Sequence, residues 1–282
     1  MINSLILGGG GYHGLITCGI LEKLICENKI ELTNIKYIFG TSVGSLIGVL
    51  CCLDVDFAII NKYFINRPWE KTLELSSEIL MNLYNKKGIC NEYFFKVILE
   101  SIFYSKNLEL TLTLEELYNI CKIELHIYTI EVSSFEVVDL SYKTHPSLSV
   151  IKAINMSCAI PYVFEPVLYE DKFYIDGGIL CNYPIERAIK IVKDSSQIFG
   201  IRIKRNNIDN LEKLNIFEYA YFLHHQFCKK QREENDCKLE SEIIIDCKNM
   251  DLNDSFNVFF EKEVREKFLN VGYDKAKIFL EK

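Results

Sequence analysis

Short apolar runs alternate with segments of helical periodicity near the start of the chain. Residues Ser4–Leu7 form a first run that ends in glycine, and residues Leu15–Asn28 place apolar side chains at helical spacing. A second run, Lys36–Phe39, comes just before Gly40. This order predicts a strand, a loop, a helix and a second strand. Because a helical crossover makes two strands parallel, we expect their C-terminal ends on one edge of a sheet, where α/β proteins place their sites.

The middle of the chain has a mostly helical pattern that is followed by two strands. Residues Ser42–Leu53 are apolar and predict a helix that starts where the second strand ends, and residues 54–121 are mostly helical in pattern. Residues Thr113–Glu116 predict a capping box, which satisfies the free amides at the start of a helix. Residues 124–132 and 135–140 predict the two strands of a hairpin.

Helices and strands alternate again in the next part of the chain. Residues Ser149–Ala159 predict a helix that stops before Pro161, and Phe173–Ile175 predict a strand. Residues 184–192 then predict a helix and residues 198–203 a strand.

After residue 206 the pattern changes to long helices, with residues 242–246 as the one expected strand. The chain has no internal repeat. We therefore expect an α/β domain over residues 1–205 and a mostly helical extension over residues 206–282 that packs on it.

Composition and charge narrow the classes of function. A chain of 282 residues with 49% hydrophobic content can bury a large core. Its 32 Lys and Arg residues stand against 39 Asp and Glu, for a formal net charge of -7. Since a basic surface supplies most of the affinity for a phosphate backbone, we expect no nucleic acid partner.

The cysteines and the N-terminus indicate a cytoplasmic protein. The eleven cysteines form no CxxC pair and no cluster with histidine at zinc spacing, so we expect free thiols and no metal site. The first residues lack a basic segment, and glycines interrupt their apolar run, unlike a signal peptide. The longest apolar run, Leu46–Leu53, is far shorter than the roughly 20 residues that span a bilayer. Any membrane contact is therefore expected to be peripheral.

Gly40-Thr41-Ser42-Val43-Gly44 is the pattern of a nucleophile elbow. The two glycines remove side chains that would clash where a strand turns sharply into a helix. Ser42 would then point outward as a nucleophile, and the Val43 amide and the helix dipole would face a developing oxyanion. The pentapeptide alone is also compatible with a plain turn.

Four consecutive glycines, Gly8 to Gly11, are followed by a fifth at Gly14. This glycine loop has two functional interpretations. It satisfies G-x-G-x-x-G, the dinucleotide fingerprint, but that fingerprint requires an acidic residue at the end of the second strand, where this chain has Gly40-Thr41-Ser42. The alternative is an oxyanion loop, in which the amides of Gly9, Gly10 and Gly11 donate to a negative oxygen. We favour the oxyanion loop over the dinucleotide site and over a purely structural loop.

Asp176 supplies a carboxylate at the end of an apolar strand, and Gly177 and Gly178 follow it. Asp-Gly-Gly alone is most often a turn. Within about 3 Å of the Ser42 hydroxyl, however, this carboxylate could take its proton directly as a general base.

None of the five histidines, His13, His126, His145, His224 and His225, lies at an expected position for a catalytic triad. His224 and His225 follow Asp176 in the order of an α/β-hydrolase, but they lie in an aromatic helical stretch typical of packing. We therefore expect a dyad of Ser42 and Asp176.

The chain resembles the patatin-like phospholipase family, whose signature combines G-G-G-x-[RK]-G, G-x-S-x-G and D-G-[GA]. All three occur here in that order, and residues 157–167 are similar to the family segment S-x-A-x-P-x-x-F-x-P-V. The resemblance covers roughly residues 4–205. It implies a three-layer α/β/α sandwich with a central, mostly parallel sheet, and it makes residues 1–205 the catalytic domain.

The resemblance also implies roles for single residues. Ser42 would be the nucleophile, Asp176 the general base, and Gly9, Gly10 and Gly11 the oxyanion loop. The glycines that would support these motifs are Gly14, Gly40, Gly44, Gly177 and Gly178. The implied reaction is hydrolysis of lipid carboxylic esters through an acyl-serine intermediate, with no metal or organic cofactor and with a lipid, free or at a membrane surface, as the partner.

One position departs from the family pattern, and two other functions share the same residues. His13 stands where the family has Lys or Arg, and a mostly neutral histidine would contact a lipid phosphate more weakly and in a pH-dependent way. A non-catalytic lipid-binding protein of the same fold, or an acyltransferase using the same dyad, remains open.

Residues 93–103 could line an acyl slot or form a lid, although their apolar circumference favours a core helix.

Overall fold

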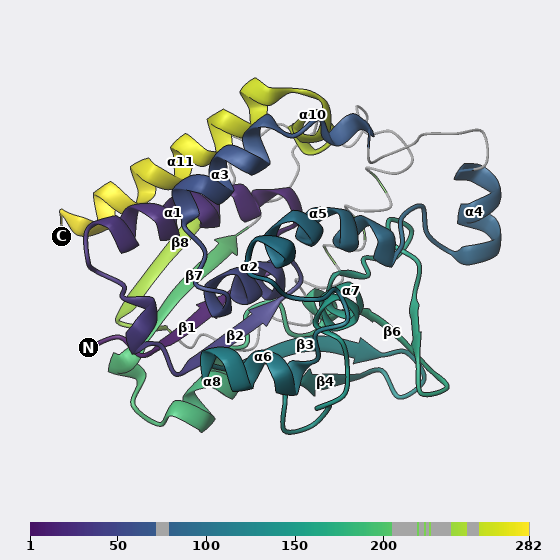
Figure 1. Ribbon diagram of the computed structural model, residues 1–282, viewed down its shortest axis with the longest axis horizontal. Helices are drawn as coiled ribbons and strands as arrows, with labels where there is room; N and C mark the ends of the chain where they lie inside the picture. Colours follow the sequence, from purple (N-terminus) through teal and green to yellow (C-terminus); the bar gives the residue numbers. More distant parts are fainter. Residues whose placement is uncertain are drawn as a thin grey trace.

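A computed structural model of the protein describes residues 1–71, 79–204, 238–246 and 254–281, together with Tyr219, Leu223 and Gln226. In these residues the chain builds one mixed sheet with helices on both faces (Figure 1). Along the sheet the strands are ordered β5-β6-β3-β2-β1-β7-β8, and β4 pairs with β3. Their bounds are β1 Ser4–Leu7, β2 Tyr37–Thr41, β3 Glu124–Glu131, β4 Glu136–Leu140, β5 Val167–Tyr169, β6 Lys172–Asp176, β7 Ile198–Lys204 and β8 Ser241–Asp246.

The sheet has a parallel part and an antiparallel end. Strands β3, β2, β1, β7 and β8 are parallel neighbours, which confirms the expected parallel arrangement of the first two strands. At the other end, β4 and β6 both pair with β3 in the antiparallel sense, and β5 pairs with β6. The predicted hairpin of β3 and β4 is confirmed, whereas the three-residue strand β5 was not predicted.

The described helices include α1 to α8, α10 and α11. Most of them lie on one face of the sheet, and α8 covers the other (Figure 1). Their bounds are α1 Gly14–Cys26, α2 Val43–Cys52, α3 Phe57–Asn66, α4 Ile79–Lys86, α5 Glu92–Ser105, α6 Leu114–Cys121, α7 Val150–Cys158, α8 Ile185–Val192, α10 Asp254–Phe260 and α11 Lys262–Leu280. The three-layer α/β/α architecture expected from the sequence is thus confirmed.

Alternation along β1 shows why the apolar run of residues 5–7 fits this sandwich. Leu5 and Leu7 join the larger core cluster, which also contains side chains of α1 and α2. Ile6 points to the opposite face, where it packs with Ile185 and Ala188 of α8. Successive side chains of a strand point to opposite faces, so a run that is covered on both sides is apolar at successive positions.

Two local predictions in the helical region are confirmed. The Thr113 hydroxyl accepts a hydrogen bond from the Glu116 N–H, and the Glu116 carboxylate accepts one from the Thr113 N–H, which completes the capping box of α6. Helix α5 buries Phe95, Leu99 and Phe103 in the main core, as expected for a core helix rather than a lid.

The C-terminal part of the chain adds to the same sheet and the same helical layer. Strand β8 extends the sheet beyond β7, and α11 lies alongside α1 (Figure 1). The two helices approach closely at glycines: a Cβ added at Gly19 would lie 2.4 Å from Leu269 O, and one at Gly272 would lie 2.3 Å from Ile16 O. The expected boundary at residue 206 lies outside the described residues, so the division into two domains stays a prediction.

Candidate active site

Ser42 lies at a sharp turn between a strand and a helix. Strand β2 ends at Thr41, Ser42 has a φ of 54° and a ψ of −129°, and α2 begins at Val43. A positive φ is rare for a residue with a side chain and carries strain that the surroundings must offset. The turn is tight because Cβ atoms at its two glycines would meet backbone: one at Gly40 would lie 2.8 Å from Gly44 O, and one at Gly44 would lie 2.0 Å from Leu7 O.

Asp176 meets Ser42 at this turn. The Ser42 Oγ donates a hydrogen bond of 2.7 Å to the Asp176 Oδ2, while the other carboxylate oxygen accepts one of 2.6 Å from the Gly178 N–H. Both side chains are nearly buried, with 4% of each residue exposed. The carboxylate is therefore oriented by a backbone amide on one side and is within reach of the serine proton on the other.

Ser157 contacts the backbone of the turn at Ser42. Sequence reasoning did not single it out. Its Oγ accepts a hydrogen bond of 2.9 Å from the Ser42 N–H and donates one of 2.6 Å to Tyr128 O. Ser157 is fully buried in α7. It belongs to the stretch similar to the family segment S-x-A-x-P, and that stretch was the only signal in the sequence that could have pointed to it.

The glycine loop runs directly beside Ser42. A Cβ added at Gly9 would lie 3.1 Å from Ser42 Cβ and 3.3 Å from Thr41 O. A Cβ added at Gly10 would lie 2.1 Å from the end of the Ile203 side chain. The absence of a side chain at Gly9 lets the loop approach the serine this closely, and its absence at Gly10 leaves room for the Ile203 side chain.

The prediction for Gly9 needs a correction. The Gly9 N–H donates a hydrogen bond of 3.0 Å to Asn182 O, and the Gly9 carbonyl accepts one of 3.1 Å from the Asn182 Nδ2. An amide that is already bonded to a carbonyl is not free for an oxyanion. The Gly9 N–H is therefore not placed as an oxyanion donor, and the expected roles of Gly10 and Gly11 stay predictions.

His13 lies in the interior rather than at a lipid-facing surface. The residue is 2% exposed, and its ring lies next to Tyr12 and Phe268, with centroids 4.1 and 5.8 Å away. Its Nδ1 lies 3.0 Å from Gly10 O. The position that carries Lys or Arg in the family signature thus holds the glycine loop in this chain.

The other described histidines lie elsewhere. His126 is buried on β3 between Glu124 and Asp139, with ring nitrogens 3.1 and 2.8 Å from their carboxylate oxygens. His145 contacts Thr144, and burial lowers the pKa of its imidazole. His224 and His225 lie outside the described residues. Hence the direct partner that the structure gives the Ser42 hydroxyl is a carboxylate.

A cysteine beside the dyad is not a competing nucleophile. Burial, and next the charge of Asp176, raise the pKa of the Cys158 thiol well above its usual value. Because the thiolate is the reactive form of cysteine, this thiol stays protonated and inert at neutral pH. The eight cysteines that the structure describes are all free thiols.

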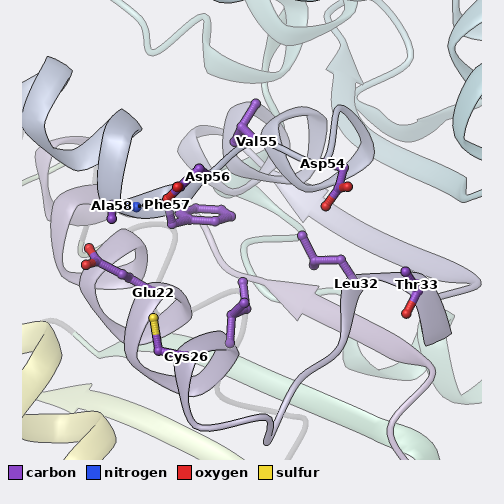
Figure 2. A pocket seen from close by; sticks show the side chains of 10 residues that line it. Glu22, Cys26, Leu32, Thr33, Asp54, Val55, Asp56, Phe57 and Ala58 are labelled. Atoms are coloured by element: carbon purple, nitrogen blue, oxygen red, sulfur yellow. Dashed lines mark hydrogen bonds between the residues drawn. The ribbon is translucent and has the colours of Figure 1, made fainter.

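Figure 2 shows a surface pocket of about 320 Å³ whose lining includes neither Ser42 nor Asp176. It is lined by residues of α1, by residues 32–33, by the link from α2 to α3 and by the start of α3, among them Glu22, Asp54 and Phe57. Ser42 precedes the first residue of α2 and Asp54 follows its C-terminal end, so a helix of ten residues, about 15 Å, separates the pocket from the serine.

Two further features concern metals and membranes. Within the described ranges, no three His, Cys, Asp or Glu side chains gather so that they could hold a metal ion. Among the helices of that same part of the chain, none has the length and apolar character needed to cross a membrane.

The family model of the patatin-like phospholipases matches residues 5–189. The chain belongs to this family. The match contains Gly8 to Gly14, the turn at Ser42, and Asp176 with its two glycines, so all three segments that meet at the site are family segments.

Two viral relatives share this patatin-like region. An uncharacterized protein of Acanthamoeba polyphaga mimivirus is 29% identical over 184 residues, which cover 65% of this chain and 60% of that protein. A probable lipid hydrolase of Invertebrate iridescent virus 6 is 27% identical over 190 residues, which cover 66% of this chain and 63% of that protein. The chain thus spans less than two thirds of the length of either relative.

A solved structure agrees with the patatin-like fold. VipD from Legionella pneumophila superposes with a TM-score of 0.57 at 16% sequence identity, and the superposition covers 99% of this chain and 67% of that one. At this identity the likeness concerns the fold alone.

Proposed function

We propose that the protein is a lipid acyl hydrolase that cleaves carboxylic ester bonds with Ser42 as nucleophile and Asp176 as general base. The observation that carries this proposal is the 2.7 Å hydrogen bond from the Ser42 Oγ to the Asp176 Oδ2, made at a nucleophile elbow beside a glycine loop. Membership of the patatin-like phospholipases and the name of the iridescent virus relative, a probable lipid hydrolase, support the choice of lipid esters.

The chemistry starts with proton transfer inside the dyad. As the Ser42 Oγ attacks the acyl carbonyl carbon, Asp176 takes the hydroxyl proton and the carbonyl oxygen becomes an oxyanion. When the tetrahedral intermediate collapses, the bond to the alcohol breaks and Asp176 returns the proton to the leaving oxygen. Water then repeats both steps on the acyl-serine, releases the fatty acid and restores the dyad.

The oxyanion would lie between the glycine loop and the start of α2. Gly10 and Gly11 are the loop donors in this proposal, and the Val43 N–H and the positive end of the α2 dipole add to them. One donor of this kind stabilises the transition state by roughly 3 kcal/mol in comparable hydrolases. The remaining glycines, Gly14, Gly40, Gly44, Gly177 and Gly178, provide room rather than contacts with the substrate.

The proposal extends to the setting of the enzyme. We place the catalytic part in residues 1–205, with residues 206–282 as an extension, and we propose a cytoplasmic protein that meets its lipid substrate free or at a membrane surface. The free thiols support the cytoplasmic part of this setting. No metal or organic cofactor takes part in the proposed steps.

The test is an ester hydrolysis assay with matched variants. With a short-chain nitrophenyl ester and with phospholipid in mixed micelles, the native protein releases one acid per alcohol. Ser42→Ala is expected to abolish turnover, and Ser45→Ala, whose hydroxyl donates to Ser42 O rather than to Asp176, is the control for changes to a neighbouring hydroxyl. Full activity of Ser42→Ala would end the proposal.

Two outcomes of the same assay point to the other functions that share these residues. Saturable lipid binding with no release of product by the native protein would indicate a lipid-binding protein. Transfer of the acyl group to an added alcohol in preference to water, measured by product analysis, would indicate an acyltransferase with the same acyl-Ser42 intermediate.

A further inference from the structure

Asn182 holds Gly9 on both sides of its backbone. The Asn182 Nδ2 donates to Gly9 O at 3.1 Å, and Asn182 O accepts from the Gly9 N–H at 3.0 Å. Asn182 is half-buried and lies in the loop before α8, far from Gly9 in the sequence. Two hydrogen bonds to one glycine, the most flexible residue type, fix a backbone that would otherwise have many conformations.

The side-chain bond also orients the next amide. A peptide bond is planar and trans, so the Gly9 carbonyl and the Gly10 N–H lie in one plane and point in opposite directions. By fixing the direction of Gly9 O, the Asn182 amide fixes the direction of the Gly10 N–H. The Gly10 N–H is a proposed oxyanion donor, and the Asn182 side chain bonds to the far side of its peptide.

His13 makes the equivalent contact one peptide later. A carbonyl oxygen only accepts, so the His13 Nδ1, 3.0 Å from Gly10 O, carries the proton. Gly10 O shares a peptide plane with the Gly11 N–H, the second proposed donor. The ring itself is held by Tyr12 and by Phe268 of α11.

Asn182 also belongs to the segment that carries the general base. A Cβ added at Gly178 would lie 2.7 Å from the Asp176 Oδ1 and 2.8 Å from the Asn182 Oδ1, so both side chains converge on this glycine. One residue earlier, Cys181 O accepts a hydrogen bond of 2.8 Å from the Thr41 hydroxyl, at the end of β2. The segment from Asp176 to Asn182 thus contacts the nucleophile turn and the glycine loop together.

We propose that Asn182 and His13 are positioning residues that hold the Gly10 and Gly11 amides toward the oxyanion by hydrogen bonding to the carbonyls of the same peptides. The inference deepens the proposed function and rests on it. Bonds to these carbonyls also polarise the peptides and strengthen their N–H groups as donors. Neither side chain touches the substrate in this arrangement.

The first arm of the test removes the Asn182 donor. In Asn182→Ala and in the isosteric Asn182→Asp we expect kcat for a nitrophenyl ester to fall about 10-fold to 100-fold, less than the loss of a donor itself. We expect KM to change less than about threefold, because the ground-state ester gains little from the oxyanion donors. The control is Asn66→Ala, since the Asn66 Nδ2 donates to Lys62 O on the exposed side of α3.

The second arm uses His13 and a conservative rescue. The side-chain amide of asparagine can place a donor near the position of the imidazole Nδ1, whereas leucine cannot donate. His13→Leu is therefore expected to lower kcat about 10-fold or more, and His13→Asn to recover most of the loss. Thermal unfolding of each variant shows which changes act on stability instead.

The deciding readout is the affinity for a trifluoromethyl ketone, which adds to the serine and forms a stable oxyanion. If Asn182 positions the donors, the inhibition constant of this ketone rises in Asn182→Ala by the same factor as kcat falls. An unchanged constant in Asn182→Ala, or an unchanged kcat, would overturn the inference. Activity that is lost in Ser42→Ala but kept in Asn182→Ala defeats only this inference, whereas activity kept in Ser42→Ala defeats the proposed function.

Discussion

The two halves of the proposed dyad come from parts of the sheet that are built in different ways. Ser42 follows β2 in the parallel part, and its turn is shaped by close backbone contacts at Gly40 and Gly44. Asp176 ends β6 at the antiparallel end, where it pairs with Thr129 of β3. Although β6 runs opposite to β2, it pairs only with residues 129–131 at the C-terminal end of β3. Its last residue, Asp176, therefore stops level with the end of β2, where Thr41 pairs with Tyr128 of β3.

The difference lies in what fixes each residue. The elbow depends on steric fit: a side chain at Gly40 would meet Gly44 O, and one at Gly44 would meet Leu7 O of β1. The carboxylate depends on strand pairing and on polar contacts from distant segments. We therefore expect changes to the residues that shape the elbow to cost more stability than changes to the residues that support Asp176.

The largest effect is expected for Asp176→Asn. The amide keeps the shape of the carboxylate but cannot take the serine proton, so kcat for ester hydrolysis should fall about 10⁴-fold, as when the acid of a catalytic triad is replaced. Thermal unfolding should change little. Steady-state kinetics and calorimetry on the same preparation check both parts, and a variant with native kcat would show that Asp176 is not the base.

Gly44→Ala tests the Ser42 side by sterics. The added Cβ would lie 2.0 Å from Leu7 O, and backbone on both sides leaves it no room. The free energy of unfolding should fall by about 3 kcal/mol or more. Urea unfolding measures it, with Gly48→Ala as the control, because there the nearest atoms are the ends of the Ile38 and Leu125 side chains at 3.0 and 3.1 Å.

Ser157→Ala removes a polar support of the elbow. The Ser42 N–H and Tyr128 O both lose their partner in a buried site, which costs about 1 to 3 kcal/mol of stability. A shift of the Ser42 backbone should also lower kcat about 10-fold to 100-fold. If activity and unfolding both match the native protein, the Ser157 contacts are dispensable.

Thr129→Val makes the corresponding change on the Asp176 side, with the smallest expected effect. The Thr129 Oγ1 lies 2.9 Å from Met156 O and 2.8 Å from Ile175 O, next to the general base. Valine keeps the shape, so the free energy of unfolding should fall by only about 1 kcal/mol. Urea unfolding measures this loss. A loss of unfolding free energy larger than that of Ser157→Ala would show that the support of Asp176, and not that of the elbow, contributes more to stability.

The sequence predicted the elbow because its signal is local. Gly-x-Ser-x-Gly between an apolar strand and an apolar helix is a pattern of five consecutive residues that can be recognised from the sequence alone. The same holds for the Thr113 and Glu116 capping box, which the structure confirms. The meeting of Ser42 with Asp176 was reached only by joining separate motifs, since it depends on the pairing of β6 with β3.

The contacts made by loops could not be predicted from the sequence. Nothing in the pattern indicates that Asn182 reaches back to Gly9, because an asparagine in a loop has many possible partners. Because this contact was not predicted, Gly9 was expected to donate to an oxyanion, whereas its N–H donates to Asn182 O. The strand β5 was missed because three residues carry too little periodicity.

The central claim is that a carboxylate alone activates Ser42. A fluorophosphonate probe reacts with activated serines without presuming a substrate, and mass spectrometry locates the labelled residue. We expect the native protein to be labelled at Ser42, and Asp176→Asn to react at least about 100-fold more slowly, in line with the loss of its base. Labelling at another residue, or labelling of Asp176→Asn at the native rate, would contradict the account.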